Sequence, residues 1–188
     1  MNSHLLMILW LLVYSGIIVF LDRKYLLLRD TSTANDKPYS LSRVQLAWWM
    51  GFVLCAFVAL VFAKNNPNFS VPTFSDGILI VMGISSATSI AATVTDVSDQ
   101  SNNPLSRHQN SEGNGFFLDI LSDKDGTSVP RLQTVLFNII FAVWFFLKVW
   151  NDGTIPDLEP NTLVLLGLSS GTYATLKTTE NKTTKSVG

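Results

Sequence analysis

The chain has few of the residues that most often carry catalysis or bind metal ions. Its 188 residues include one cysteine, Cys55, and two histidines, His4 and His108, which have no obvious nucleophile beside them. A single cysteine excludes an intrachain disulfide, and so few Cys and His side chains exclude a zinc site built from them. The sequence also has no phosphate-binding loop and no Gly-x-Ser-x-Gly elbow. We therefore expect a protein that is not an enzyme and has no cofactor and no resident metal ion.

Charge is also scarce. Only 14% of the residues are charged, whereas soluble domains carry about 25%. The deficit is local, because the charges lie between long apolar runs in a chain that is 47% hydrophobic. The net charge of −1 argues against electrostatic binding of nucleic acid.

Five apolar runs are each near the roughly 20 residues that a membrane-spanning helix needs. The first run has no Lys or Arg before it and no small-residue cleavage site after it, so we interpret it as a retained anchor rather than a signal peptide. The fifth run is milder, and its match to the third supports its assignment. The runs are approximately Leu5–Leu21, Val44–Ala63, Gly77–Thr95, Leu132–Leu147 and Asn161–Leu176.

An internal repeat arranges these runs into two hairpins. Ser40-Leu-Ser-Arg-Val-Gln45 precedes the second run, and Gly83-Ile-Ser-Ser-Ala-Thr88 lies within the third. The same order returns as Ser128-Val-Pro-Arg-Leu-Gln133 and Gly167-Leu-Ser-Ser-Gly-Thr172. The sequence thus predicts an all-α polytopic membrane protein with five transmembrane helices, in which one N-terminal helix precedes two helical hairpins related as parallel repeats.

The repeat and the polar stretches divide the chain into five parts. An N-terminal anchor helix with a basic inner loop comes first, and two hairpins follow, separated by a flexible inner linker that contains a short interfacial segment. A polar tail ends the chain. These parts are residues 1–39, 40–96, 97–127, 128–180 and 181–188.

The basic residues predict an orientation. Of the Lys and Arg residues, only Lys64 and Lys148 fall on one side of the five predicted spans, and all the others fall on the opposite side. The positive-inside rule then places the N-terminus outside and the C-terminus inside.

Small and polar residues within the spans form a candidate helix-packing or pore-lining set. Small residues spaced by four let helices approach closely, and hydroxyl groups can bond across the contact; the alternative is a polar stripe that lines an ion path. Asn138, whose counterpart in the first repeat is Met50, is the type of residue that joins helices. The set is Gly83, Ser85, Ser86, Thr88, Asn138, Gly167, Ser169, Ser170, Gly171 and Thr172.

Four charged residues flank the hairpins at the inner membrane edge. Arg43 and Arg131 open the first helix of each hairpin, while Asp96 and Glu180 close the second. Both placements oppose the helix dipole. Our hypothesis is that the arginines pair with these acids; the rival interpretation is that they hold lipid phosphates.

The motif Ser-x-x-Arg-x-Gln, followed after a span by Leu165-Leu-Gly-Leu-Ser-Ser-Gly-Thr-Tyr173, resembles a group of uncharacterised bacterial inner-membrane proteins built from a doubled helical hairpin. The likeness covers roughly Ser40 to Glu180, and the first copy departs from it at Ala87 and Ser89. The resemblance implies a bacterial source, with the protein integral to the bacterial cytoplasmic membrane, and no particular activity.

We expect the function of an integral membrane anchor or assembly subunit. Such a protein would be a homo-oligomer surrounded by membrane lipids, and it would present its inner loops to a cytoplasmic protein partner. The alternative is a small oligomeric channel with a Ser/Thr-lined pore. The spans lack a buried Asp, Glu or Lys, which counts against a proton- or ion-coupled transporter.

Overall fold

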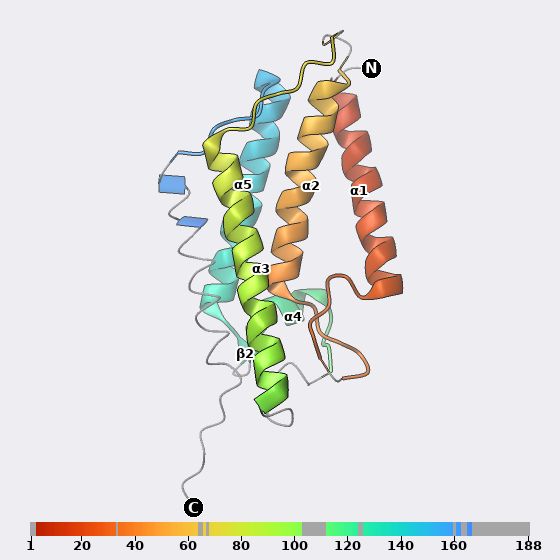
Figure 1. The fold of residues 1–188 in the computed structure, drawn as a ribbon, viewed down its shortest axis with the longest axis vertical. Coiled ribbons are helices and arrows are strands. Elements are labelled where there is room, and N and C mark those ends of the chain that lie inside the picture. Colours follow the sequence, from red (N-terminus) through yellow and green to blue (C-terminus); the bar gives the residue numbers. More distant parts are fainter. Residues whose placement is uncertain are drawn as a thin grey trace, which may run out of the picture.

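The computed structural model describes residues 3–32, 34–63, 66, 68–102, 112–123, 126–159, 161–162 and 165–166, and for residues 95–102 it describes the backbone alone. In this part of the chain four long helices lie side by side: α1 (Ser3–Tyr25), α2 (Leu41–Val61), α3 (Asp76–Asn102) and α5 (Val129–Asp152) (Figure 1). Before α5 come a short helix, α4 (Phe116–Leu121), and two paired short strands, β1 (Ser122–Asp123) and β2 (Gly126–Thr127).

The long helices alternate in direction. In Figure 1, α1 and α3 run from the upper end to the lower end, and α2 and α5 run back. The α1–α2 connection, α4 and the start of α5 therefore share one end, which we call the basal end. Each long helix is long and apolar enough to cross a membrane, which confirms a mainly helical chain with at least four such helices.

Two boundaries bear on the predicted spans. Helix α3 continues to Asn102, beyond the predicted span end at Thr95, because nothing in the polar sequence that follows breaks a helix before Pro104. The fifth predicted span, Asn161–Leu176, lies almost wholly outside the described residues. Its four described positions, 161–162 and 165–166, are helical.

Helix α2 is the centre of the bundle, because it packs against α1, α3 and α5. The side chains around it form one apolar cluster, while many apolar side chains on the outer surfaces of α1, α3 and α5 remain exposed, as expected for helices that face lipid. The buried members from α2, α3 and α5 are Trp49, Val53, Ala56, Ala59, Ile78, Val81, Phe145 and Val149.

Far from the basal end, the segment after α5 folds back onto the start of α3. The Ser75 hydroxyl donates to the carbonyl of Pro156 at 3.2 Å. A Cβ atom on Gly77 would lie 2.8 Å from the backbone N and O of Leu158. Only glycine at position 77 therefore allows this close approach, which ties the start of α3 to the segment that follows α5.

We predict that Gly77→Ala lowers the free energy of unfolding by about 1–3 kcal/mol, the usual cost of overpacking. Gly16→Ala on α1 is the matched control, because a Cβ there meets nothing within 4 Å and alanine favours the helix. Thermal or denaturant unfolding in detergent micelles measures both. Equal effects of the two substitutions would contradict the proposed close approach.

Candidate functional site

The basal half of the bundle interior is lined with polar side chains. Gln45 from α2, Ser85 and Thr88 from α3, and Thr134 and Asn138 from α5 are all buried. The half farther from the basal end is closed by the apolar cluster around α2. We call these five residues the buried polar layer. Burying polar groups between helices is costly unless they are hydrogen-bonded, so their partners decide what the layer can do.

Asn138 joins α5 to α2 within this layer. Its Oδ1 accepts a hydrogen bond from the Trp49 indole Nε1 at 2.5 Å, and its Nδ2 donates to the Thr134 carbonyl at 2.7 Å. The Trp49 side chain is 0% exposed and meets the Phe145 ring edge-on, with 6.5 Å between ring centroids. Both ends of the Asn138 amide are thus used inside the protein, in the manner of a residue that joins helices.

The first Gly-x-Ser-Ser-x-Thr block is split between two faces of α3. Ser85 and Thr88 are buried, together with Ile78, Val81 and Ala92, on the face turned into the bundle. Gly83 lies on the outer face with open space beside it, and Ser86 is half-buried between the two. The sequence pattern predicted one set of packing or pore-lining residues, whereas the helix places these residues on two different surfaces.

The hydroxyl groups of the polar layer differ in their bonding. Thr88 and Thr134 each donate to a carbonyl one turn earlier, of Ile84 and Pro130, at 2.8 and 2.9 Å. The Oγ of Ser85 is buried and has no hydrogen-bond partner among the described residues. Ser85 is therefore the one hydroxyl of this described layer that is not satisfied by its own helix.

The sequence repeat is not repeated in burial. Gln45 is buried, whereas its counterpart Gln133 is exposed; Arg131 is buried, whereas its counterpart Arg43 is half-buried. Successive residues on a helix point about 100° apart, so a small rotation of α5 relative to α2 turns a different part of the same motif inward. The two helices also differ in their surroundings, since α2 has neighbours on three sides.

The basal end carries a folded cap formed by residues 22–32, 34–40 and 112–123. Arg29 organises its first segment: Nη1 lies 3.1 Å from Asp36 Oδ1 and donates to the Lys37 carbonyl at 2.6 Å, while Nε lies 3.8 Å from Asp22 Oδ2. The guanidinium also lies 3.7 Å from the ring centroid of Tyr39. These contacts order the α1–α2 connection, which the sequence described only as a basic loop.

Asp119 on α4 fastens the two segments of the basal cap together. Its Oδ2 accepts the backbone N–H of Tyr39 at 3.1 Å, and its Oδ1 accepts that of Asn114 at 2.7 Å. The Gly113 N–H also donates to the Asp36 carbonyl at 2.9 Å. Sequence reasoning missed Asp119, although a lone acid in an apolar six-residue helix was the available signal.

Of the four residues in the paired-charge hypothesis, the structure describes the side chains of only the two arginines. Arg43 donates to the Thr31 hydroxyl at 3.3 Å, and Arg131 donates to the Asp119 carbonyl at 3.5 Å. The side chains of Asp96 and Glu180 lie outside what the structure describes, as do all of Gly167, Ser169, Ser170, Gly171 and Thr172. The pairing of these acids therefore stays a hypothesis.

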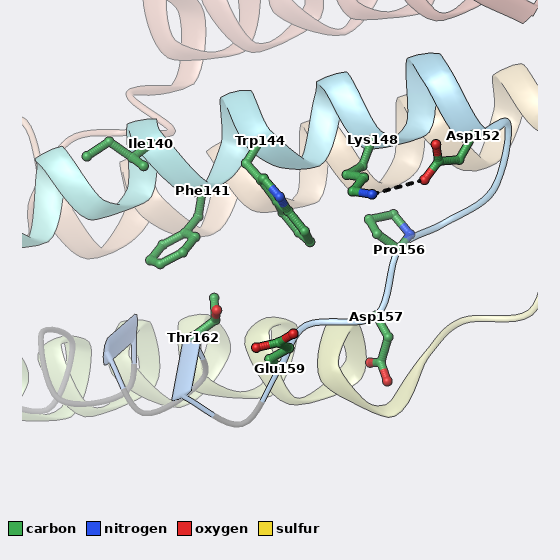
Figure 2. Close-up of a pocket in the computed structure, with 9 residues that line it drawn as sticks. All are labelled: Ile140, Phe141, Trp144, Lys148, Asp152, Pro156, Asp157, Glu159 and Thr162. Carbon is green, nitrogen blue, oxygen red and sulfur yellow. Dashed lines mark hydrogen bonds and ion pairs between the residues drawn. The ribbon is translucent and has the colours of Figure 1, made fainter.

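A cavity of about 570 Å³ lies between α5 and the segment that follows it, at residues 156–159 and Thr162 (Figure 2). Trp144 and Phe141 form its apolar side, and Glu159 faces them from the opposite wall. Lys148 at its rim is paired with Asp152 at 3.4 Å in an exposed ion pair, which contributes little energy. Among the described residues, no three His, Cys, Asp or Glu side chains are placed to hold a metal ion.

The comparisons with known proteins add no identity. No protein-family model, no curated protein and no solved structure matches the chain. The candidate site is therefore defined by its geometry: a buried polar layer inside the bundle and a folded cap at its basal end.

We predict that Asn138→Leu and Trp49→Phe each destabilise the bundle by about 1–3 kcal/mol, because each leaves a buried polar partner unsatisfied. The double variant should be less destabilised than the sum of the two, with a coupling of roughly 0.6–1.7 kcal/mol for a bond between membrane helices. Unfolding of the wild type, the two single variants and the double variant in one detergent measures this coupling. Strict additivity would show that the bond contributes nothing.

Proposed function

We propose that this protein is an integral membrane anchor or assembly subunit that forms oligomers and presents its basal cap to a cytoplasmic protein. The observation that carries the proposal is the burial of Ser85 and Thr88 inside the bundle of a single chain. The alternative, a channel on an axis shared by several chains, needs polar side chains that are exposed on each chain. These hydroxyl groups are turned away from any such axis.

A path through a single chain is also disfavoured. Trp49, Ile78, Val81 and Phe145 close the bundle above the polar layer, and each is at most 2% exposed. Asn138 has both amide atoms engaged. A polar layer with an apolar seal stabilises helix packing, whereas conduction needs continuous access for water and ions.

The oligomer is supported by the outer face of α3. Gly83, Ala87 and Ala91, spaced by four residues, are all exposed there. A stripe of small residues lets the backbone of another helix approach closely. The same stripe leaves the packing inside the single chain unaffected, since a Cβ on Gly83 would meet nothing within 4 Å.

The partner is supported by the basal cap. Asp119 and Arg29 hold its two segments in one arrangement, and Asn35, Asp36 and Glu112 are exposed on its surface. Fixed loops bind a partner at a lower entropic cost than loose ones. The connections at the opposite end show no comparable described network of ion pairs. The basal cap is thus the surface on which we place the partner.

We predict that Gly83→Leu converts the oligomer to a monomer, because the bulky side chain prevents close helix approach. Gly16→Leu on α1 is the matched control, since Gly16 is likewise exposed and a Cβ there would meet nothing within 4 Å. Analytical ultracentrifugation in detergent measures the mass. A monomeric wild type, or an oligomer that survives Gly83→Leu, would refute the proposed seam.

The partner surface is tested with a photo-crosslinking amino acid at Asn35, in the wild type and with Asp119→Ala. We expect one discrete protein adduct in cells, lost when Asp119→Ala releases Tyr39 and Asn114, and no adduct from the exposed Ser70 near the opposite end.

Liposomes containing the purified oligomer should show no ion flux above protein-free liposomes. Sustained flux, with no adduct from the basal cap, would favour the channel instead.

A further inference from the structure

A groove of about 280 Å³ lies at the basal end between α2, α4 and α5. It is separate from the polar surface of the basal cap, because α4 forms one of its walls with the apolar face of that helix. Val44 and Val135 on opposite walls pack around a small apolar cluster of Leu41 and Ile120. Eight of the ten lining residues are apolar, among them Val44, Trp48, Phe117, Ile120, Val135 and Ile139.

The groove offers an occupant little to hydrogen-bond. The polar residues that reach its lining are Gln45 and Asn138. Both amide atoms of Asn138 are engaged, with Trp49 and Thr134. Gln45 has a partner in the chain, and its Oε1, which makes no hydrogen bond among the described residues, is itself buried and not accessible to an occupant. A polar ligand would lose its hydrogen bonds to water without replacement. The lining therefore selects a hydrocarbon.

The groove opens toward the surrounding membrane rather than toward the centre of the bundle. Trp48, Ile139 and Phe117 in its wall are 38%, 44% and 72% exposed, and Leu136 and Ile140 continue the exposed apolar surface along α5. Val135 and Ile139 lie roughly 9–15 Å along α5 from its start, at 1.5 Å per residue. That depth falls within one leaflet of a hydrocarbon core about 30 Å thick.

We propose that this groove binds one acyl chain of a phospholipid from the leaflet on the basal side. The inference rests on the bundle spanning a membrane and is independent of the proposed protein partner. At this depth the medium is lipid hydrocarbon, so the groove and the exposed apolar surface of α5 form one continuous contact with it. Side chains of α2, α4 and α5 bound the groove, and an acyl chain is much thinner than a helix, which is about 10–12 Å across.

The test uses the full-length protein in nanodiscs of phosphatidylcholine that carries a photoreactive diazirine in the middle of one acyl chain. Adducts are mapped to residues by mass spectrometry after peptide digestion. We expect labelling concentrated on Trp48, Phe117 and Ile139, above that of the exposed residues elsewhere on α5. Val135→Phe fills the groove and should cut this labelling roughly tenfold, the change expected from a loss of about 1.4 kcal/mol in affinity.

Leu136→Phe is the matched control, because Leu136 is the neighbouring, lipid-exposed residue outside the groove; it should leave the labelling unchanged. Val44→Phe, from the opposite wall, should repeat the loss if Val135→Phe fails to fold. Labelling spread evenly over the lipid-facing surface would overturn the proposal. So would labelling unchanged by both filling variants, or crosslinks at these residues to a second copy of the chain instead of lipid.

Discussion

The hydrogen bond between Trp49 and Asn138 is the interaction on which the rest of the bundle depends. In hydrocarbon, a polar group has no water to hydrogen-bond with, so its hydrogen bonds must be made within the protein. The buried Asn138 on α5 and the Trp49 indole N–H on α2 satisfy each other at 2.5 Å, so α5 has one favoured rotation and depth against α2. Since α2 also packs against α1 and α3, this bond positions α5 relative to the other three long described helices.

The two ends of the bundle differ in the contacts that hold the chain in place. Far from the basal end the interior is apolar, and chain crossings depend on close backbone contact, as where Leu158 passes over Gly77. At the basal end the interior is polar, and the chain outside it is ordered by charge, through Arg29 and Asp119. The apolar groove lies at the basal end between α2, α4 and α5, beside Gln45 and Asn138 of the buried polar layer.

The sequence predicted the helices well because their signal is long and uniform. Runs of about 20 apolar residues locate α1, α2, α3 and α5, and the repeated Ser-x-x-Arg-x-Gln motif locates the starts of α2 and α5. The basal cap could not be predicted from the sequence, because its order comes from single contacts such as Asp119 with Tyr39, which are 80 residues apart. The facing of Gly83 away from Ser85 was readable in principle, since positions two residues apart on a helix differ by about 200°, but spacing alone does not say which face is buried.

The repeat itself explains why one asymmetric bond is needed. Helices α2 and α5 begin with nearly the same motif, so they could pack in either of two registers, or exchange roles, at similar energy. The counterpart of Asn138 in the first repeat is Met50, which is exposed, and the counterpart of Trp49 in the second is Phe137, which cannot donate. Only one pairing of the two helices therefore satisfies the amide. A single buried polar residue that sets register at some cost in stability is an established device in packed helices. Here it would break the symmetry that the repeat creates, and the difference in burial between Gln45 and Gln133 is the structural consequence.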